Sequence, residues 1–342
     1  MGYCLDCLAF VASLGALAPV SGQSRPAEAL LAVGSDDASN GEPLSHIRGV
    51  AIDDHGRLIV LDAGEHRLVV ISPTGRRLQY LGRRGAGPGE FLSPMAIAVT
   101  AKGRVFVVDP QTSRLTEYVA SPDSVRYVRD WPLQVRGYDL CAAGERIFVL
   151  GELNRRLIHE VSFGNDEATL RSFAEVKSHH RFASSPLIRP LLTQGLLACS
   201  PNGNFIGFSP RQLGEVRVFR ADGTEQLFIR LTPFQEIGMI PIDRGFRYDY
   251  SAPFFQQNVA MLVDDDGAPT VEIITLRPRY QQRPIVETFE FRQLTPGGTW
   301  RSSAPGNATL VVRTSTRVVC TREEPYPIVF VYERRSNRGL CP

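Results

Sequence analysis

The chain has 342 residues, of which 43% are hydrophobic and 22% are charged, and its formal net charge is +2. This composition is typical of a folded globular protein, and a charge so close to zero provides no overall attraction to nucleic acid or to an anionic membrane. The sequence contains no apolar run of about 18 residues or more, so we expect no membrane-spanning helix.

The N-terminus has features of an export signal. Residues 8–20 (LAFVASLGALAPV) form an apolar segment as long as a signal-peptide core, and VSG at 20–22 provides a cleavage site before Gln23. The residues before this core include no Lys or Arg and contain Asp6, which is atypical of a signal peptide. We predict a signal peptide at 1–22 and a periplasmic or secreted mature chain. A disordered tail or an incorrectly assigned start is the alternative.

The next part of the chain contains an internal repeat. GVAIDDHGRLIVLDAGEHRLVVI (49–71) and AIAVTAKGRVFVVDPQTSRLTEY (96–118) align without a gap at an offset of 47. Each copy predicts a short inner strand, a tight turn with a glycine, a nearly continuous apolar strand and a third strand. RRLQYLG (76–82) alternates in polarity and predicts an outer strand. A repeat of forty-odd residues built from four antiparallel strands is the signature of a β-propeller blade.

The linker between the two copies, GRRGAGPGEFLSP (82–94), is rich in glycine and ends in Glu-Phe and a proline. It resembles the linker of the NHL-repeat family of β-propellers, a Gly-x-x-Gly-x-Gly-x-Gly-[acid/amide]-Phe segment that leads into Pro and the next inner strand. The resemblance covers roughly residues 30–120. Its matching residues are Gly82, Gly85, Gly87, Gly89, Glu90, Phe91, Pro94, Gly103, Val107 and Asp109.

Weaker copies of the pattern predict a single all-β domain, a six-bladed β-propeller of four-stranded antiparallel blades, over residues 23–342. Five or seven blades remain as alternatives, because the last two copies are the weakest. Residues 28–34 lack inner strands before them, so we expect them to close the ring by pairing with the last blade. The predicted blades cover about 44–82, 91–131, 132–176, 190–231, 245–291 and 299–335.

Four cysteines follow the predicted signal peptide, an even number that suits an oxidising compartment. We predict that Cys320 and Cys341 form a disulfide that anchors the C-terminal tail. For Cys141 and Cys199, which both precede the first hairpin turn of a blade, we favour separate small buried residues over a bond.

Candidate site residues are expected at one face, because inner strands begin and second strands end at the same mouth of a propeller's channel. Arg48 and Arg136 are the stronger candidates, since guanidinium groups recognise carboxylates or phosphates. Asp62 and Asp109 recur at one repeat position, where capping of a loop is the favoured alternative, and pairing with the recurring Arg67 and Arg114 is expected. The predicted ligand-binding set is His46, Arg48, Asp62, Asp109, Arg136, Tyr138 and Arg211.

Two classes of function remain. The first is an exported, monomeric binding module that takes an anionic small molecule or a protein at the channel mouth, without a cofactor and without nucleic acid. The second is a metal-dependent hydrolase or lyase, since NHL-like propellers are similar to amidating lyases and to lactonase and arylesterase propellers, in which Ca²⁺ is a candidate metal. Only His46 matches the inward-facing histidines that this resemblance implies, and no catalytic sequence motif is present. We therefore predict no catalytic residue and no metal ligand.

Overall fold

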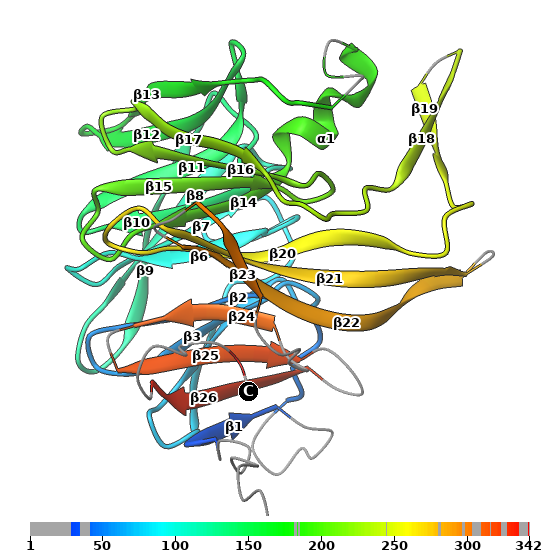
Figure 1. Ribbon diagram of the computed structural model, residues 1–342. Helices are drawn as coiled ribbons and strands as arrows, with labels where there is room; N and C mark the ends of the chain where they lie inside the picture. The colour runs from blue at the N-terminus through cyan, green and yellow to red at the C-terminus, as the bar shows by residue number, and fades with distance from the viewer. Residues whose placement is uncertain are drawn as a thin grey trace, which may run out of the picture.

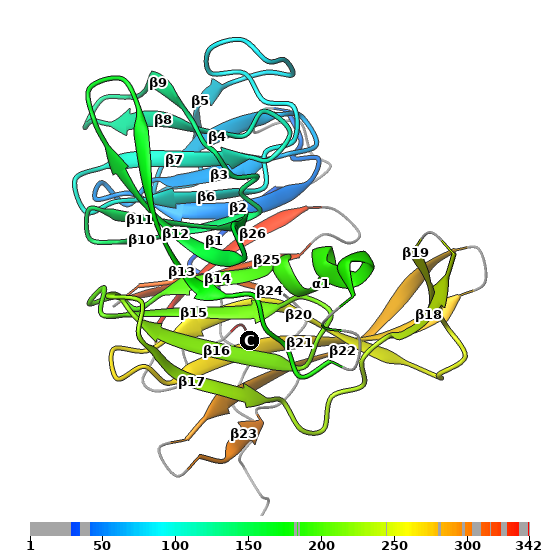
Figure 2. The same cartoon turned by 90° about the horizontal axis from the view of Figure 1, so that it is seen from above.

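The computed structural model describes residues 29–34, 42–180, 183, 185–243, 245–279, 282–295, 298–302, 309–314, 316–322, 327–334 and 341. Its strands form six four-stranded antiparallel sheets arranged as the blades of a propeller (Figures 1 and 2), which confirms the predicted fold class. The innermost strands contact one another in a closed ring in the order β2, β6, β10, β14, β20 and β24. The predicted signal peptide lies outside the described residues.

The first three blades follow one another directly in the sequence. Blade 1 contains β2 (Ile47–Ile52), β3 (Leu58–Asp62), β4 (Arg67–Ile71) and β5 (Arg77–Leu81). Blade 2 contains β6 (Ala96–Val99), β7 (Arg104–Asp109), β8 (Arg114–Ala120) and β9 (Val125–Pro132). Blade 3 contains β10 (Asp139–Ala143), β11 (Arg146–Leu153), β12 (Arg156–Phe163) and β13 (Ala168–Glu175).

The last three blades are less uniform. Blade 4 contains β14 (Gly195–Cys199), β15 (Phe205–Pro210), β16 (Glu215–Arg220) and β17 (Glu225–Arg230). Blade 5 contains the long strands β20 (Phe255–Val263), β21 (Pro269–Arg279) and β22 (Gln282–Leu294), with the short β23 (Trp300–Ser302) at its edge. Blade 6 contains β24 (Thr309–Arg313), β25 (Arg317–Arg322), β26 (Ile328–Glu333) and β1 (Leu31–Val33).

Strand β1 closes the ring. It comes from the other end of the chain and pairs antiparallel with β26, with Leu31 opposite Val331 and Val33 opposite Val329. The pairing satisfies backbone groups that would otherwise form a free sheet edge. The predicted closure by an N-terminal strand is therefore confirmed.

The hydrophobic cores lie between neighbouring blades. Strands β3 and β4 are buried along nearly their whole length, which explains their continuous apolar sequences. Ile59 of blade 1 packs in one cluster with Val105 of blade 2, and Val60 packs in another with Val319 of blade 6. Each middle strand therefore contributes alternate side chains to the two interfaces of its blade. The outer strand β5 alternates between half-buried and exposed residues.

The glycine-rich linker of residues 82–94 folds around Glu90 and Phe91. The Phe91 side chain is completely buried, and a side chain at Gly82 would meet its ring at 2.5 Å. Glu90 Oε2 accepts a hydrogen bond from Gly87 N–H at 2.8 Å. Arg114 donates to the carbonyl oxygens of Gly87 and Glu90. The residues on which the NHL resemblance depends are therefore structural in this chain, because they shape the connection between two blades.

An insertion lies on one side of the propeller, outside the six sheets. It consists of a 3-10 turn (Pro186–Ile188), the helix α1 (Arg189–Thr193) and the hairpin of β18 (Gly238–Ile242) and β19 (Gly245–Asp249). Both parts project from the same side of the disc, on the right in Figure 1. Residues 245–249, which the sequence analysis places in blade 5, thus belong to this hairpin, and residues 300–302 join blade 5 and not blade 6.

The insertion packs against the loop that follows β15. Leu213 of this loop shares a buried cluster with Ile188 and Met239, and the Tyr248 hydroxyl donates to Gln212 Oε1 at 3.0 Å. Neither helical turn is long and apolar enough to cross a membrane, and the same is true of every helix in the described part of the chain.

Candidate functional site: the mouth of the central channel

The inner strands of the blades surround a central cavity of about 590 Å³. A volume of this size is typical of small-molecule sites. Residues of β2, β6, β10, β14 and β20 form most of its wall, and Thr309 and Thr321 complete it at blade 6. The polar and ionisable residues among those that line it are His46, Arg48, Tyr138, Asp139, Arg211, Thr309 and Thr321.

Four of the seven residues predicted as ligand-binding line this cavity together, namely His46, Arg48, Tyr138 and Arg211. They come from three blades and meet because inner strands begin, and second strands end, at the same face of the disc. Arg48 lies at a β-bulge, where the pairing of β2 with β3 shifts register between Ile47 and Gly49. A bulge residue does not take part in the regular strand pairing, so its side chain can point in a different direction. Arg48 is exposed at the mouth.

Asp62 and Asp109 are not part of the cavity lining described here, because both are completely buried at the ends of β3 and β7. Asp62 Oδ1 accepts hydrogen bonds from the backbone N–H groups of Ser45 (3.0 Å) and His46 (3.1 Å). The carboxylate therefore holds the loop that carries His46, and it does not line the cavity itself.

Asp109 has the same role in the next blade, where Oδ2 accepts from the N–H groups of Leu92 (2.7 Å) and Ser93 (2.9 Å). The arginine that follows each aspartate differs between the blades. Arg67 Nε pairs with Asp62 Oδ2 at 3.3 Å. Arg114 instead donates to the linker and pairs with Asp130 at 3.4 Å, so its expected pairing with Asp109 is not made.

Arg136 is exposed and also lies outside the described lining of the cavity. It precedes β10 by three residues, whereas Tyr138 and Asp139 lie at the start of that strand. Arg136 was predicted as a site residue because it enters an inner strand and is not repeated. The structure shows that the residues at the strand start reach the channel.

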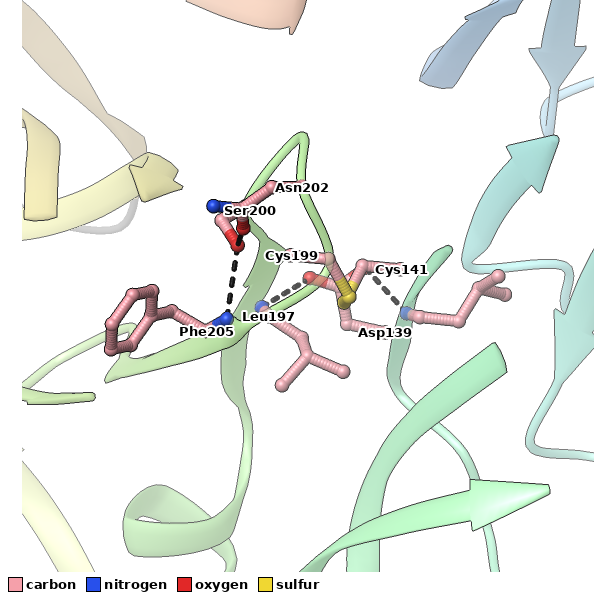
Figure 3. Close-up of a disulfide and its surroundings, with 8 residues drawn as sticks. Asp139, Cys141, Leu197, Cys199, Ser200, Asn202 and Phe205 are labelled. Carbon is pink, nitrogen blue, oxygen red and sulfur yellow. Dashed lines mark hydrogen bonds between the residues drawn. A yellow bond between two sulfur atoms is a disulfide. The ribbon is translucent and has the colours of Figure 1, made fainter. Parts of the chain in front are cut away.

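Asp139 also lines the cavity, although the sequence did not predict it there. It occupies an inner-strand position that is Ala96 in blade 2, as its pairing with Leu150 shows. Its Oδ1 accepts from Leu140 N–H at 2.9 Å, and its Oδ2 accepts from Leu197 N–H of blade 4 at 2.8 Å (Figure 3). Burial raises the pKa of Asp139 to about 6, although these hydrogen bonds and the charge of Arg211 act in the opposite direction.

Arg211 is the partner charge of Asp139 at the mouth. Burial lowers its pKa, the negative charge of Asp139 opposes that effect, and the positive charge of Arg48 adds to it. All three groups line the same cavity. Two guanidinium groups and one carboxylate leave the cluster with one net positive charge when Asp139 is ionised.

Asn258 fixes the loop on which Arg211 stands. Its backbone N–H donates to Arg211 O at 2.8 Å, and its Nδ2 donates to Pro210 O at 2.7 Å and to Leu213 O at 2.8 Å. The Asn258 side chain is completely buried, so these hydrogen bonds are shielded from water. Blade 5 therefore positions a charged side chain that belongs to blade 4.

A disulfide joins blades 3 and 4 beside Asp139. Figure 3 shows Cys141 of β10 bonded to Cys199 of β14, with a Cα–Cα distance of 5.6 Å. The expectation of two separate thiols is thus wrong: adjacent inner strands converge at the axis, and residues that are 58 positions apart come within bonding distance. The disulfide and the Asp139–Leu197 hydrogen bond thus connect β10 to β14 at two positions. A second disulfide links Cys320 to Cys341.

The far end of the cavity is apolar. The inner strands end there with one side chain from each of the first five blades: Ile52, Val99, Ala142, Cys199 and Leu262. All five are partly exposed to the channel. The cavity therefore changes from charged at the mouth to apolar at depth.

Among the described residues, no three His, Cys, Asp or Glu side chains lie close enough together to bind a metal ion. The ionisable groups that do converge at the channel are two arginines, one histidine, one tyrosine and one aspartate. This set suits the recognition of an anion.

Comparison with known proteins agrees with the architecture. Residues 40–177 match a family described as a 6-bladed beta-propeller. No curated protein matches the chain. Many solved structures are similar, all at low sequence identity.

A member of the duf4221 family from Bacteroides vulgatus is 9% identical, with a TM-score of 0.55 over 90% of this chain and 97% of that one. The beta-propeller domain of Cps50 (Swd1) from Myceliophteria thermophila is 9% identical, with a TM-score of 0.51 over 91% of this chain and 100% of that one. A catalytically inactive virginiamycin B lyase from Staphylococcus aureus, solved with quinupristin, is 10% identical, with a TM-score of 0.50 over 84% and 95%. At such identities the similarity extends to the fold alone.

Proposed function

We propose that this protein is an exported, NHL-like β-propeller that binds a small anionic molecule at the mouth of its central channel. The observation that carries the proposal is the convergence of Arg48 and Arg211, from different blades, on one cavity of about 590 Å³. Guanidinium groups favour planar anions because they can donate two parallel hydrogen bonds to a carboxylate. Tyr138 and His46 add polar groups at the same level.

Export is supported by the cysteines. Both pairs that follow the predicted signal peptide are bonded, Cys141 to Cys199 and Cys320 to Cys341. Structural disulfides persist mainly in oxidising compartments such as the periplasm or the extracellular space. A fusion of residues 1–22 to a reporter that is active only after export tests this part of the proposal, and retention of the reporter in the cytoplasm would contradict it.

Binding can be tested by calorimetry on the mature chain, with octanoate as the anionic probe and with Arg48→Ala and Arg211→Ala as variants. Loss of one hydrogen bond to a charged group costs about 1.5–3 kcal/mol, so each variant should weaken binding by roughly ten- to a hundredfold. Arg83→Ala is the matched control, because the Arg83 side chain is 81% exposed on the linker and lies outside the cavity lining. Undiminished binding by both channel variants would reject the site.

Arg136→Ala separates the sequence-based site from the structural one. Arg136 is exposed and outside the cavity lining, so we expect binding within about twofold of the unmodified chain, because a screened surface charge contributes little. A loss as large as that of Arg48→Ala would move the site outward, to the rim. The metal-dependent hydrolase or lyase remains the alternative, although no three His, Cys, Asp or Glu side chains gather closely enough to hold an ion among the described residues.

A further inference from the structure

We infer that the ligand of the channel is an amphiphilic monocarboxylate, which binds with its carboxylate between Arg48 and Arg211 and its apolar chain along the channel axis. This inference rests on the proposed function and narrows it to a class of molecule. Three features of the cavity lead to it: the direction of its polarity gradient, the net charge of its mouth and its volume.

The polarity gradient follows the inner strands. Arg48, Tyr138 and Asp139 stand where β2 and β10 begin. At the other ends of the inner strands, the described residues that line the cavity carry no charge. These residues are Ile52, Val99, Ala142, Cys199 and Leu262. Between the two ends the lining residues Ile97, Leu140 and Met261 carry no charge, and their side chains are buried in the cores between blades. The charged side chains that line the cavity therefore stand at one end of it, which favours a ligand that is charged at that end only.

The charge of the mouth limits the ligand to one carboxylate. Arg48 and Arg211 bring two positive charges, and Asp139 offsets one of them. One ligand carboxylate leaves this cluster neutral. A second carboxylate at the opposite end of the ligand would lie against Val99 and Leu262, where the described wall offers it no cation.

The volume sets the length of the apolar chain. A cavity of about 590 Å³ exceeds what a carboxylate group alone would fill, and small-molecule sites of roughly 300–1,000 Å³ enclose most of a drug-sized ligand. Each methylene transferred from water to this wall should tighten binding by about fourfold. The affinity must then rise steadily with chain length until the chain reaches the far end.

The test is a calorimetric series on the mature chain with butanoate, hexanoate, octanoate and decanoate. Decanol, which lacks the charge, and sebacate, which has a carboxylate at each end, serve as probes of the two ends. We expect an affinity gain of about fourfold per methylene, and binding of decanol and sebacate at least about tenfold weaker than that of decanoate. Equal affinities for butanoate and decanoate would overturn the inference and leave the proposed anion site intact. Absence of binding by the whole series would reject both.

Two variants at the far end locate the chain within the channel. Ala142→Leu fills space at the end of β10 and should weaken decanoate binding by about tenfold while butanoate binding stays unchanged. Leu262→Asn places an amide on the wall formed by blade 5 and should have the same selective effect without adding volume. The urea midpoint of each variant reports its folding. If either folded variant binds decanoate as well as the unmodified chain does, the chain does not occupy the far end.

Discussion

Blades 1 and 2 differ from blades 4 and 5 in how they hold their loops at the channel face. In blades 1 and 2 a repeated aspartate, Asp62 or Asp109, accepts backbone hydrogen bonds from the preceding loop, and a glycine-rich linker joins the two sheets. In blades 4 and 5 a side chain without a counterpart in the repeat, Asn258, holds the loop of Arg211. The later part of the chain also contains the hairpin β18–β19 and the longest strands.

The difference shows that repeated residues hold the loops, whereas residues that depart from the repeat line the channel. Asp62 and Asp109 recur because every blade must satisfy the buried N–H groups of its entering loop. Arg48 stands in a bulge, Asp139 replaces a small residue, and Arg211 follows a strand that ends in proline instead of aspartate. These three residues break the repeat, and all three line the channel.

The largest effect on stability is expected from the linker of the regular half. Phe91→Ala should lower the free energy of unfolding by about 3–5 kcal/mol, because it removes a completely buried aromatic ring. Phe254→Ala, in the irregular half, is the matched control, since Phe254 is 39% exposed and should cost less than about 1 kcal/mol. Urea unfolding measures both, and similar losses would mean that the linker is not a core element.

The disulfides provide the next test, because one of them joins the two halves. Cys141→Ala/Cys199→Ala opens a loop of 58 residues and should cost about 4 kcal/mol on the chain-entropy model. Cys320→Ala/Cys341→Ala opens one of 21 residues and should cost about 3 kcal/mol. Unfolding of both double variants under one set of conditions gives the order. A larger loss of stability on removing the Cys320–Cys341 disulfide would contradict the expectation that the Cys141–Cys199 disulfide contributes more.

Asp109→Ala and Asn258→Ala compare the two ways of holding a loop. Each removes a buried partner of backbone groups and should cost about 1–3 kcal/mol of stability. Only Asn258→Ala should also weaken octanoate binding, by roughly tenfold, because it removes the side-chain hydrogen bonds to Pro210 O and Leu213 O on either side of Arg211. Calorimetry on the folded variants decides between them, and equal binding losses would remove the distinction.

Asp139 should make the stability of the protein depend on pH. Its pKa is raised by burial to about 6, whereas an unfolded aspartate titrates near about 3.9. The folded state thus binds this proton more tightly, so the contribution of Asp139 to stability is fully present below pH about 4 and is lost as the pH rises through about 6.

We expect Asp139→Asn to remove this part of the pH dependence of the urea midpoint. Anion binding should follow the same proton: affinity for decyl sulfonate, which stays ionised, should rise as the pH falls through about 6, because protonation of Asp139 leaves Arg48 and Arg211 unopposed. His46→Gln is the control, because it replaces another ionisable side chain that lines the same cavity. An unchanged pH profile in Asp139→Asn would assign the effect to another group.

The smallest effects are expected at exposed ion pairs of the linker. Arg83 pairs with Glu90 at 2.7 Å, but its side chain is 81% exposed. Arg83→Ala should change the free energy of unfolding by less than about 1 kcal/mol. Glu90→Ala should cost more, because Glu90 also accepts from the backbone of Gly87. Equal effects of the two substitutions would show that the ion pair, and not the backbone contact, stabilises the linker.

Much of the fold could be predicted from the sequence because each blade is a local unit. Strand order, turns and buried faces follow from residues close together in the chain, such as the apolar run 58–61 and the turn at Gly56. The hairpin β18–β19 was missed because it resembles a short strand pair of a blade and differs only in its partners.

The lining of the channel was predicted in part. His46, Arg48, Tyr138 and Arg211 could be chosen because their strand positions define one face. Asp139 and the bond between Cys141 and Cys199 could not, because each depends on the approach of two strands from different blades. The signal that could have found Asp139 is its charge at an inner-strand position that is Ala96 in the preceding blade.

The sequence by itself determined the blade as a unit and the closure of the ring, because periodic burial and turn chemistry act over a few residues. Only the tertiary structure decided which side chains share the channel and which strands are joined across it. The reason is geometric: the stagger and distance between neighbouring inner strands arise from the packing of all six sheets, and no short segment contains that information.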